Sequence, residues 1–359
     1  MFSSSLFVAL ILAFVLAYYL TPLARYLAIR WGALDQTEKR KIHQTPVPRL
    51  GGLALYLAYT SVSLFLLPRS AHTAALLLGG TAMFLVGALD DLKGLNPRTK
   101  LAGQVAGALL AYFLGLRVDF LTNPWDGMFF LGSLSLPVTV LWLVGITNAL
   151  NLIDGLDGLA AGVATIAAVT LAVVAWLEGQ AQAATAALVL AAVTLAFLRF
   201  NFYPAQLFMG DSGAMFLGFN LAALAVLGTA KSTTVLSLLV PVLALGLPIL
   251  DTSWAILRRL YHGQPIFGAD KEHLHHRLLR LGLHQRQAVL LIYGMHISLG
   301  ISAVLLAMLT TAQSILFLAA VTVAALVLVN LLGLSAGEVG KAQTHDRSHT
   351  KSWQTGPPV

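Results

Sequence analysis

The chain has 359 residues, of which 58% are hydrophobic and only 10% charged, and its mean hydropathy is +0.80. This composition excludes an ordinary soluble domain and indicates a polytopic membrane protein. Cysteine is absent, which excludes disulfides and thiolate metal sites. The net charge of +7 comes from basic residues spread over many loops, so a nucleic-acid-binding surface is not indicated.

Apolar stretches long enough to cross a membrane as helices recur along the chain. A helix needs about 20 apolar residues to span about 30 Å of hydrocarbon. In chain order, the predicted spans cover residues 4–24, 50–68, 73–89, 101–116, 133–150, 158–177, 182–199, 213–230, 234–257, 288–309 and 313–333. We therefore predict an all-α fold with about eleven transmembrane helices, in which residues 1–334 form one transmembrane domain and residues 335–359 a disordered tail.

The basic residues predict how the chain is oriented. If the spans alternate in direction, all 22 lysines and arginines except Arg69, Arg117 and Lys231 fall on the same side of the membrane. The positive-inside rule places that side in the cytosol. We expect the N-terminus outside and the C-terminus and tail in the cytosol. We also expect the first segment to remain as a span, because it lacks a charged n-region and a cleavage site.

Acidic residues gather on the same predicted side, although the positive-inside rule does not require it. Of the 15 acids, only Asp119, Asp126 and Glu178 fall on the opposite side. Acids at the edge of the hydrocarbon are costly unless they are paired, hydrated or bound to a cation. The clusters at or near span ends contain Asp90 and Asp91, Asp154 and Asp157, Asp211, and Asp251. Each acid alone is compatible with a helix cap, but four clusters at one side predict a shared site.

The stretch NALNLIDGLDGLAAG (148–162) places a polar residue at every third position where two spans meet. Residues three apart differ by about 60° around a helix, so one face cannot hold Asn148, Asn151, Asp154 and Asp157 together. The glycine after each aspartate lets the chain leave the helix there. Oxygen ligands in a chain without cysteine suit a hard cation, so these acids predict a Mg²⁺ site.

The longest predicted cytosolic loop, at about 258–287, contains a cluster of imidazoles and guanidiniums. Its core is His273, His275, His276 and Arg277. The spacing of two of the histidines is found in zinc sites, and the segment is also compatible with a basic amphipathic helix at the membrane surface. The third interpretation is a site for a diphosphate. Carboxylates for Mg²⁺ beside cations for phosphate oxygens are the groups that phosphoryl transfer needs, and they favour this third interpretation.

Lys100 is a further candidate cation, at the start of the fourth predicted span. The alternative interpretation is an ordinary lysine that only sets the topology.

Five motifs, in order along the chain, resemble those of the polyprenyl-phosphate N-acetylhexosamine-1-phosphate transferases. They are HQTPVPRLGG (43–52), LDDLKG with TKLAGQ (89–104), NALNLIDGLDGLAAG (148–162), FNFYPAQLFMGDSG (200–213) and DKEHLHHRLL (270–279). Members of that family move a sugar 1-phosphate from a UDP-sugar to a polyprenyl phosphate and release UMP. The resemblance implies a phosphotransferase that depends on Mg²⁺, with Mn²⁺ as the alternative metal, and makes residues 1–334 its catalytic domain.

The resemblance also implies roles for single residues. Asp211 matches the Mg²⁺ ligand, and Asn151 is expected as a second ligand. Asp154 lies in the same polar centre and is expected among the catalytic groups. Asp90 and Asp91 match a pair that binds or deprotonates the lipid phosphate.

The remaining implied roles concern the catalytic lysine and the donor. Lys100, within the matched motif TKLAGQ, is expected among the catalytic groups. Asp157, Asn201 and Phe208 match the uridine pocket, where Phe208 would stack on the base. The residues that match the diphosphate-contacting loop are His273, His275, His276 and Arg277.

The pattern His273-Leu-His275-His276-Arg277 bears on the sugar donor. The branch that transfers phospho-MurNAc-pentapeptide carries three consecutive histidines, one further residue and Glu, and is kept as the alternative. With its predicted spans and cytosolic C-terminus, the chain is more similar to the branch that starts teichoic acid, O-antigen or related glycans. The expected substrates are UDP-GlcNAc and undecaprenyl phosphate, the product is undecaprenyl-diphospho-GlcNAc, and a homodimer is a family expectation.

The expected site lies on the cytosolic face of a bacterial plasma membrane, where a soluble donor and a lipid headgroup can meet. We hypothesise that an oxygen of the lipid phosphate attacks the β-phosphorus of the donor in line and that UMP leaves. A covalent phosphosugar intermediate on an aspartate is the alternative.

Two other classes of protein compete with this interpretation. A transporter would carry its acids near mid-membrane on broken helices, whereas these acids sit at one face, with Asp251 the exception that we expect to have a buried partner. An intramembrane prenyltransferase gathers aspartates as N-x3-D-x3-D, whereas the spacing here is Asn151-x2-Asp154-x2-Asp157.

Overall fold

The computed structural model describes residues 4–35, 46–122, 128–229, 239–264 and 273–309, with a few single residues between 313 and 320. By its internal contacts the chain divides into two units, Met1–Met308 and Leu309–Val359, and the helices and strands named below belong to the first. Its helices are α1 (Ser4–Trp31), α2 (Gly52–Leu66), α3 (Ala71–Lys93), α4 (Pro97–Phe113), α5 (Ser135–Ile153), α6 (Leu159–Leu177), α7 (Ala181–Asn201), α8 (Gly210–Thr229), α9 (Leu239–Ala244), α10 (Gly246–Tyr261), α11 (Leu274–Arg280) and α12 (Gln285–Met308).

Within the described residues, seven helices are long and apolar enough to cross a membrane. They are α1, α3, α5, α6, α7, α8 and α12, and α2 is a shorter apolar helix of 15 residues. The prediction of an all-α, multi-pass membrane protein is confirmed. The count of about eleven spans and the orientation remain predictions, and most of the eleventh predicted span and all of the tail at 335–359 lie outside the described residues.

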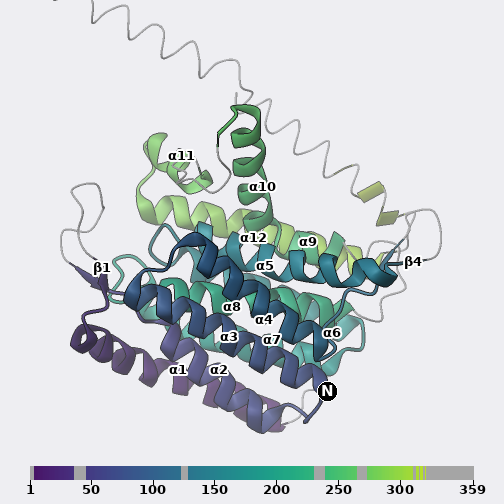
Figure 1. Ribbon diagram of the computed structural model, residues 1–359, viewed down its shortest axis with the longest axis horizontal. Coiled ribbons are helices and arrows are strands. Elements are labelled where there is room, and N and C mark those ends of the chain that lie inside the picture. Colours follow the sequence, from purple (N-terminus) through teal and green to yellow (C-terminus); the bar gives the residue numbers. More distant parts are fainter. Residues whose placement is uncertain are drawn as a thin grey trace, which may run out of the picture. The chain divides into compact units, whose positions relative to one another are not determined.

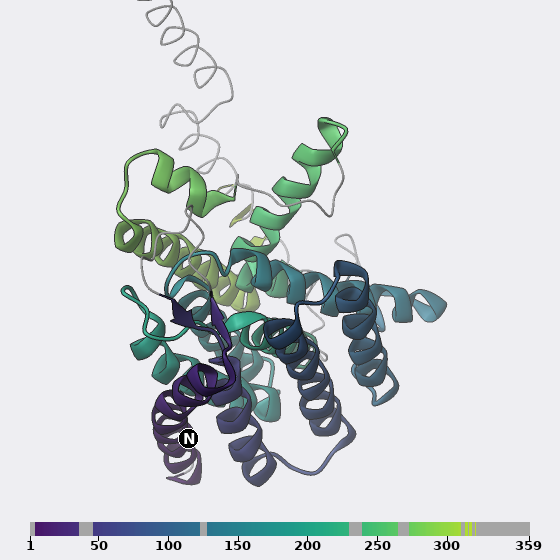
Figure 2. The ribbon, with the colours of Figure 1, turned by 60° about the vertical axis from the view of Figure 1, so that its left-hand side comes forward.

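The ninth predicted span is not one straight helix. Its described part consists of α9 and α10, which meet at Leu245 (φ −111°, ψ 18°). Gly246 and Pro248 follow the break. Glycine weakens a helix, and proline has no N–H to donate within it, so a new helix starts more easily here than the old one continues. Figures 1 and 2 show α10 rising out of the bundle formed by the other long helices.

Two short antiparallel ladders interrupt the otherwise helical fold. β1 (Leu34–Asp35) pairs with β2 (Val47–Pro48), and β3 (Phe120–Thr122) pairs with β4 (Met128–Phe130). Figure 1 shows β1 and α11 toward one end of the bundle and β4 at the opposite end. The ends that carry the predicted functional motifs are those near β1 and α11.

Helix α8 forms the centre of the bundle. It packs against α3, α5, α6 and α2. In its apolar stretch 83% of the residues are buried, compared with 28% in α1. Small residues allow this close packing: a Cβ on Gly52 would overlap the backbone of Gly213 in the first turn of α8, and a Cβ on Gly87 would lie 2.5 Å from the Asp211 carbonyl oxygen. The start of α8, which carries Asp211, is therefore held by α2 and α3 at close range.

Candidate active site

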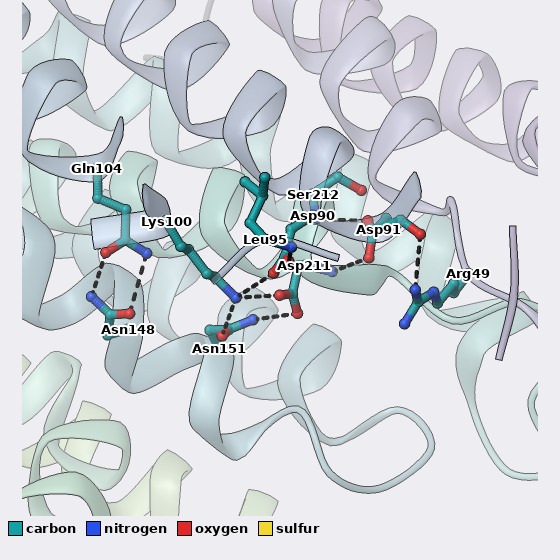
Figure 3. Close-up of polar contacts among 10 residues, drawn as sticks. All are labelled: Arg49, Asp90, Asp91, Leu95, Lys100, Gln104, Asn148, Asn151, Asp211 and Ser212. Atoms are coloured by element: carbon teal, nitrogen blue, oxygen red, sulfur yellow. Dashed lines mark hydrogen bonds and ion pairs between the residues drawn. The ribbon is translucent and has the colours of Figure 1, made fainter. Parts of the chain in front are cut away.

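Four predicted site residues from four helix ends meet in one polar cluster (Figure 3). The Lys100 ammonium lies 2.9 Å from Asp90 Oδ2, donates to Asn151 Oδ1 at 3.3 Å and pairs with Asp211. Asn151 Nδ2 donates to Asp211 Oδ1 at 2.9 Å. Asp90 and Asn151 lie in the last turns of α3 and α5, and Lys100 and Asp211 lie in the first turns of α4 and α8. We call these four residues the polar cluster.

The turn between α3 and α4 explains how Lys100 returns to Asp90. Gly94 adopts φ +66° directly after α3, a conformation that favours glycine. Asp90 Oδ1 then accepts the backbone N–H of Leu95 at 2.6 Å. Asn96 caps α4 by accepting the Thr99 N–H at 2.8 Å. The local sequence therefore reverses the chain within a few residues and brings the lysine beside the aspartate.

Asp91 uses both carboxylate oxygens to cap α8. Oδ1 accepts the Asp211 N–H at 2.9 Å and Oδ2 accepts the Ser212 N–H at 3.0 Å. Gly210 has φ +69°, and a Cβ there would lie 2.5 Å from Asp91 Oδ2. Asp91 thus lies beside the polar cluster, and its carboxylate already binds backbone amides. This geometry gives Asp91 a positioning function for Asp211, a function that its motif did not suggest.

Arg49 joins the site without having been predicted as a site residue. Its Nη2 donates to the Asp91 carbonyl oxygen at 2.9 Å. The segment that carries it is bonded to the residues before Asp211, because Phe208 N donates to Pro48 O at 2.9 Å and Gly51 N donates to Phe208 O at 2.9 Å. The available signal was an arginine two residues before the glycine pair in the motif PVPRLGG.

The turn after α5 carries the next two predicted aspartates. Asp154 follows Ile153 at the end of the helix, and its pKa is raised to about 8, first by burial and then by the carboxylates of Asp211, Asp91 and Asp157. Asp157 is buried, and its Oδ2 accepts the Ala205 N–H at 2.8 Å. Asp154 therefore belongs electrostatically to the polar cluster, whereas Asp157 binds the loop that follows α7.

Asn201 is the last residue of α7, and Phe208 lies in that same loop, which leads from α7 to α8. Asn201 is buried and its Nδ2 donates to the Leu207 carbonyl at 3.0 Å. Its Oδ1 is buried and has no hydrogen-bond partner among the described residues. Phe208 is half-buried, and its backbone is paired to the segment around Arg49. The predicted uridine-pocket residues Asp157, Asn201 and Phe208 thus meet around this loop, since Asp157 and Asn201 both bind its backbone.

The histidine cluster forms the start of α11. His273 Nδ1 lies 2.8 Å from Asp251 Oδ2, and Leu274 N donates to Asp251 Oδ1 at 2.8 Å. Asp251, on α10, therefore has the buried partner that we expected, and that partner is His273. Arg277 is exposed one turn further along α11.

His275 connects α11 to the turn after α5. Its ring lies against Gly155, where a Cβ would be 2.5 Å from His275 Nε2. The side chain is buried, and burial first, then the neighbouring imidazole of His276, lower its pKa to about 4. His275 is therefore neutral at pH 7 in the protein alone. His276 is half-buried beside it, with ring centroids 4.1 Å apart.

The donor atoms of the polar cluster suit a magnesium ion better than a zinc ion. Asp90, Asn151 and Asp211 each direct an oxygen toward one positively charged nitrogen, and Mg²⁺ takes one or two carboxylates with substrate oxygens or waters for the rest. Among the described residues no three His, Asp or Glu side chains are grouped to hold a metal. A zinc site at His273 and His276 therefore lacks a third ligand among the described residues.

Comparison with known proteins agrees with the motifs. Residues 73–229 match the model of glycosyl transferase family 4. A probable undecaprenyl-phosphate N-acetylglucosaminyl 1-phosphate transferase of Bacillus subtilis is 42% identical over 83% of this chain and 84% of its own length. A decaprenyl-phosphate N-acetylglucosaminephosphotransferase of Mycolicibacterium smegmatis is 36% identical over 78% of this chain and 77% of its own.

A relative from the alternative branch is also similar. The phospho-N-acetylmuramoyl-pentapeptide-transferase of Anoxybacillus flavithermus is 32% identical over 75% of this chain and 88% of its own length. These similarities extend well beyond the motifs. The chain therefore belongs to glycosyl transferase family 4, the family of the polyprenyl-phosphate N-acetylhexosamine-1-phosphate transferases.

Proposed function

We propose that this enzyme transfers GlcNAc-1-phosphate from UDP-GlcNAc to undecaprenyl phosphate, forming undecaprenyl-diphospho-GlcNAc and UMP, and so starts the synthesis of a cell-envelope glycan. The observation that carries the proposal is the polar cluster, which joins Asp90, Lys100, Asn151 and Asp211 at the ends of four helices. The Bacillus relative, named for this activity, supports the choice of substrates.

The reaction exchanges one phosphoanhydride bond for another. An oxygen of the lipid phosphate bonds to the β-phosphorus of the donor, and the bond from that phosphorus to the bridging oxygen breaks. The α-phosphate leaves as UMP with the electron pair of that bond. The second pKa of a phosphate monoester is about 6, so the acceptor is mostly dianionic at pH 7 and needs no strong base. Charge stabilisation and alignment are therefore the main tasks of the protein.

Each part of the site suits one of these tasks. Lys100 places a positive charge beside Asp90 and Asp211, where the phosphates of the two substrates would meet. Asp211 and Asn151, with Asp90 nearby, would hold Mg²⁺. The ion when bound supplies positive charge for the diphosphate oxygens. Asp91 keeps Asp211 in place by capping α8.

The α11 segment, which lies against the turn after α5, would bind the diphosphate of the donor. Asp251 fixes His273, and His275 lies on Gly155 next to Asp154. Arg277 is exposed and offers two parallel N–H groups to phosphate oxygens. The loop after α7, which contains Phe208 and is bound by Asp157 and Asn201, would receive the uridine.

We also propose that this end of the bundle faces the cytosol of a bacterium, in its plasma membrane. All lysines and arginines except Arg69, Arg117 and Lys231 fall on the predicted cytosolic side, together with the aspartates of the site. The cytosol is where nucleotide sugars are made available to a lipid headgroup. A homodimer is a further proposal that rests on the family alone.

A reconstituted assay tests the proposed function. Purified enzyme in detergent or vesicles is given labelled UDP-GlcNAc, undecaprenyl phosphate and Mg²⁺, and both UMP and the lipid product are measured. We expect equal amounts of the two, loss of both with EDTA, and recovery with Mg²⁺ or Mn²⁺. Release of UDP in place of UMP would show sugar transfer without phosphate, and preferred use of UDP-MurNAc-pentapeptide would move the enzyme to the alternative branch.

One variant tests the metal role directly. Asp211→Asn keeps the side-chain shape and one acceptor oxygen but removes the charge. We expect turnover to fall below about 1% of the wild-type rate, a loss of the size seen for key electrostatic groups, while the protein stays folded in detergent. Near-normal activity would remove Asp211 from the metal site. The same assay with Asp90→Asn and Asp91→Asn, followed over pH, separates a base from a positioning group.

A further inference from the structure

A second polar contact joins α4 and α5 deeper in the bundle. Gln104 Nε2 donates to Asn148 Oδ1 at 3.2 Å, and Asn148 Nδ2 donates to Gln104 Oε1 at 2.8 Å (Figure 3). Gln104 is fully buried, and Asn148 Nδ2 also donates to the Val144 carbonyl at 2.9 Å. The two side-chain amides thus bind each other reciprocally. We call them the amide pair.

The amide pair lies one helical turn from the polar cluster on both helices. Gln104 follows Lys100 by four residues on α4, and Asn148 precedes Asn151 by three residues on α5. Residues at these spacings share a helix face. The two helices therefore carry two contacts in register, one between Lys100 and Asn151 and one between Gln104 and Asn148.

A reciprocal amide contact is a demanding constraint on the two helices. Both hydrogen bonds form only when the helices are aligned along their axes, because a shift by one residue moves a side chain about 1.5 Å along the axis. Breaking the pair leaves polar groups without partners in an apolar region, which is costly. A neutral pair also adds no charge beside Asp90 and Asp211. Its geometry is therefore suited to alignment rather than to chemistry.

We propose that Gln104 and Asn148 are positioning residues that hold α4 against α5 so that Lys100 reaches Asp90, Asn151 and Asp211 together. The inference rests on the proposed function, in which Lys100 acts on the phosphates. The polar cluster has little tolerance for displacement, since its Lys100 contact to Asn151 is already 3.3 Å long. A small slip of α4 would lengthen this contact beyond hydrogen-bonding distance.

The test compares variants of the amide pair in the complete enzyme. Gln104→Leu and Asn148→Leu keep a side chain of similar size but remove the reciprocal hydrogen bonds. We expect kcat to fall about tenfold or more, as small displacements of catalytic groups do, with KM for UDP-GlcNAc changed less than about twofold. The exchanged variant Gln104→Asn with Asn148→Gln keeps both amides and their combined length, and we expect it to recover most of the lost kcat.

Trp142→Phe is the matched control for a purely structural effect. Trp142 lies on α5 and its Nε1 donates to the Ala222 carbonyl of α8 at 3.0 Å, so the variant also removes a hydrogen bond between helices. We expect a lower melting temperature with wild-type kcat, measured well below that temperature. The inference is overturned if Gln104→Leu keeps wild-type kcat, or if the exchanged variant fails to recover kcat while its melting temperature is restored.

The wild-type rate separates the two proposals. If wild-type enzyme forms no lipid product and no UMP, the proposed function fails. If wild-type enzyme is active and the amide variants lose only stability, the proposed function stands and the positioning role of Gln104 and Asn148 fails.

Discussion

Lys100 is the residue on which the polar cluster depends most directly. Its ammonium contacts Asp90, Asn151 and Asp211. It therefore supplies a positive charge between the carboxylates of Asp90 and Asp211. Lys100→Met keeps the length of the side chain and removes its charge. We expect kcat to fall about 100-fold to 1,000-fold, measured as UMP release at saturating Mg²⁺ and substrates.

Lys93→Met provides the matched control for that variant. Lys93 is exposed in the last turn of α3 and carries the same charge close to the site in sequence. We expect its kcat to stay within about twofold of wild type, as is usual for an exposed surface charge. Equal losses in both variants would mean that net charge at this end of the bundle, rather than the contacts of Lys100, determines the rate.

His275 makes the stability of the protein depend on pH. Its pKa is lowered to about 4 by burial, compared with 6.5 for an unperturbed histidine. Above pH 6.5 the imidazole is neutral in both the folded and the unfolded protein. As the pH falls from 6.5 to 4, the unfolded chain takes up a proton first, so the free energy of unfolding decreases in this window.

Thermal unfolding in detergent at a series of pH values checks this expectation. The melting temperature should decrease between pH 6.5 and 4, and the decrease should be smaller in His275→Gln, which cannot titrate. His284→Gln is the control, because His284 is exposed at the start of the segment leading into α12. A pH dependence that is the same in all three proteins would show that other groups cause it.

At the scale of helices, the close contact between α2 and α8 positions the metal candidate. A Cβ on Gly52 would overlap Gly213 N and lie 2.5 Å from Ser212 Oγ, and these two residues directly follow Asp211 in the chain. Gly52→Ala should therefore push the first turn of α8 away from Asp91. We expect a loss of about 1–3 kcal/mol in stability and a reduced kcat, measured by thermal unfolding and UMP release.

Gly145→Ala is the control for a glycine replaced within a helix. No heavy atom lies within 4 Å of a Cβ placed on Gly145 in α5. Alanine favours a helix over glycine by about 1 kcal/mol, so its stability should be unchanged or slightly raised and its activity normal. Wild-type behaviour of Gly52→Ala would mean that α2 and α8 can separate without moving Asp211.

The helices also show what could be predicted from the sequence and what could not. Long apolar runs predicted the positions of the long helices, because only helices satisfy the backbone in a membrane. The break between α9 and α10 was missed, since hydropathy continues through Leu245 and only Gly246 and Pro248 mark the change. The capping of α8 by Asp91 was not predictable, because it joins residues 120 positions apart.

The site was predicted as a set of residue types rather than as contacts. Aspartates at span ends indicated one shared site, and Asp90, Asn151 and Asp211 do lie together around Lys100. Their assignment as catalytic or metal-binding groups remains a prediction. Arg49, Gln104 and Asn148 were assigned no role, because their contacts depend on which segments are neighbours, and periodicity along one helix does not report this.

For the whole molecule, orientation is the untested prediction that a direct measurement can settle. The chain has no cysteine, so single cysteines can be introduced without removing others. Gln264, after α10, and Ser133, before α5, are exposed and suit the variants Gln264→Cys and Ser133→Cys. We expect a membrane-impermeant maleimide to label Ser133→Cys in intact cells, and Gln264→Cys only after the membrane is opened. The reverse pattern would place the site outside the cytosol.

The central position of α8 has a consequence for how the enzyme tolerates its surroundings. Because its neighbours enclose most of its apolar length, whereas α1 is largely uncovered, changes in acyl-chain length or sterol content act first on the outer helices. Effects of lipid composition reach Asp211, in the first turn of α8, only through these outer helices. We therefore expect relatives from membranes of different lipid composition to differ mainly at outward-facing residues, while the start of α8 keeps the same geometry.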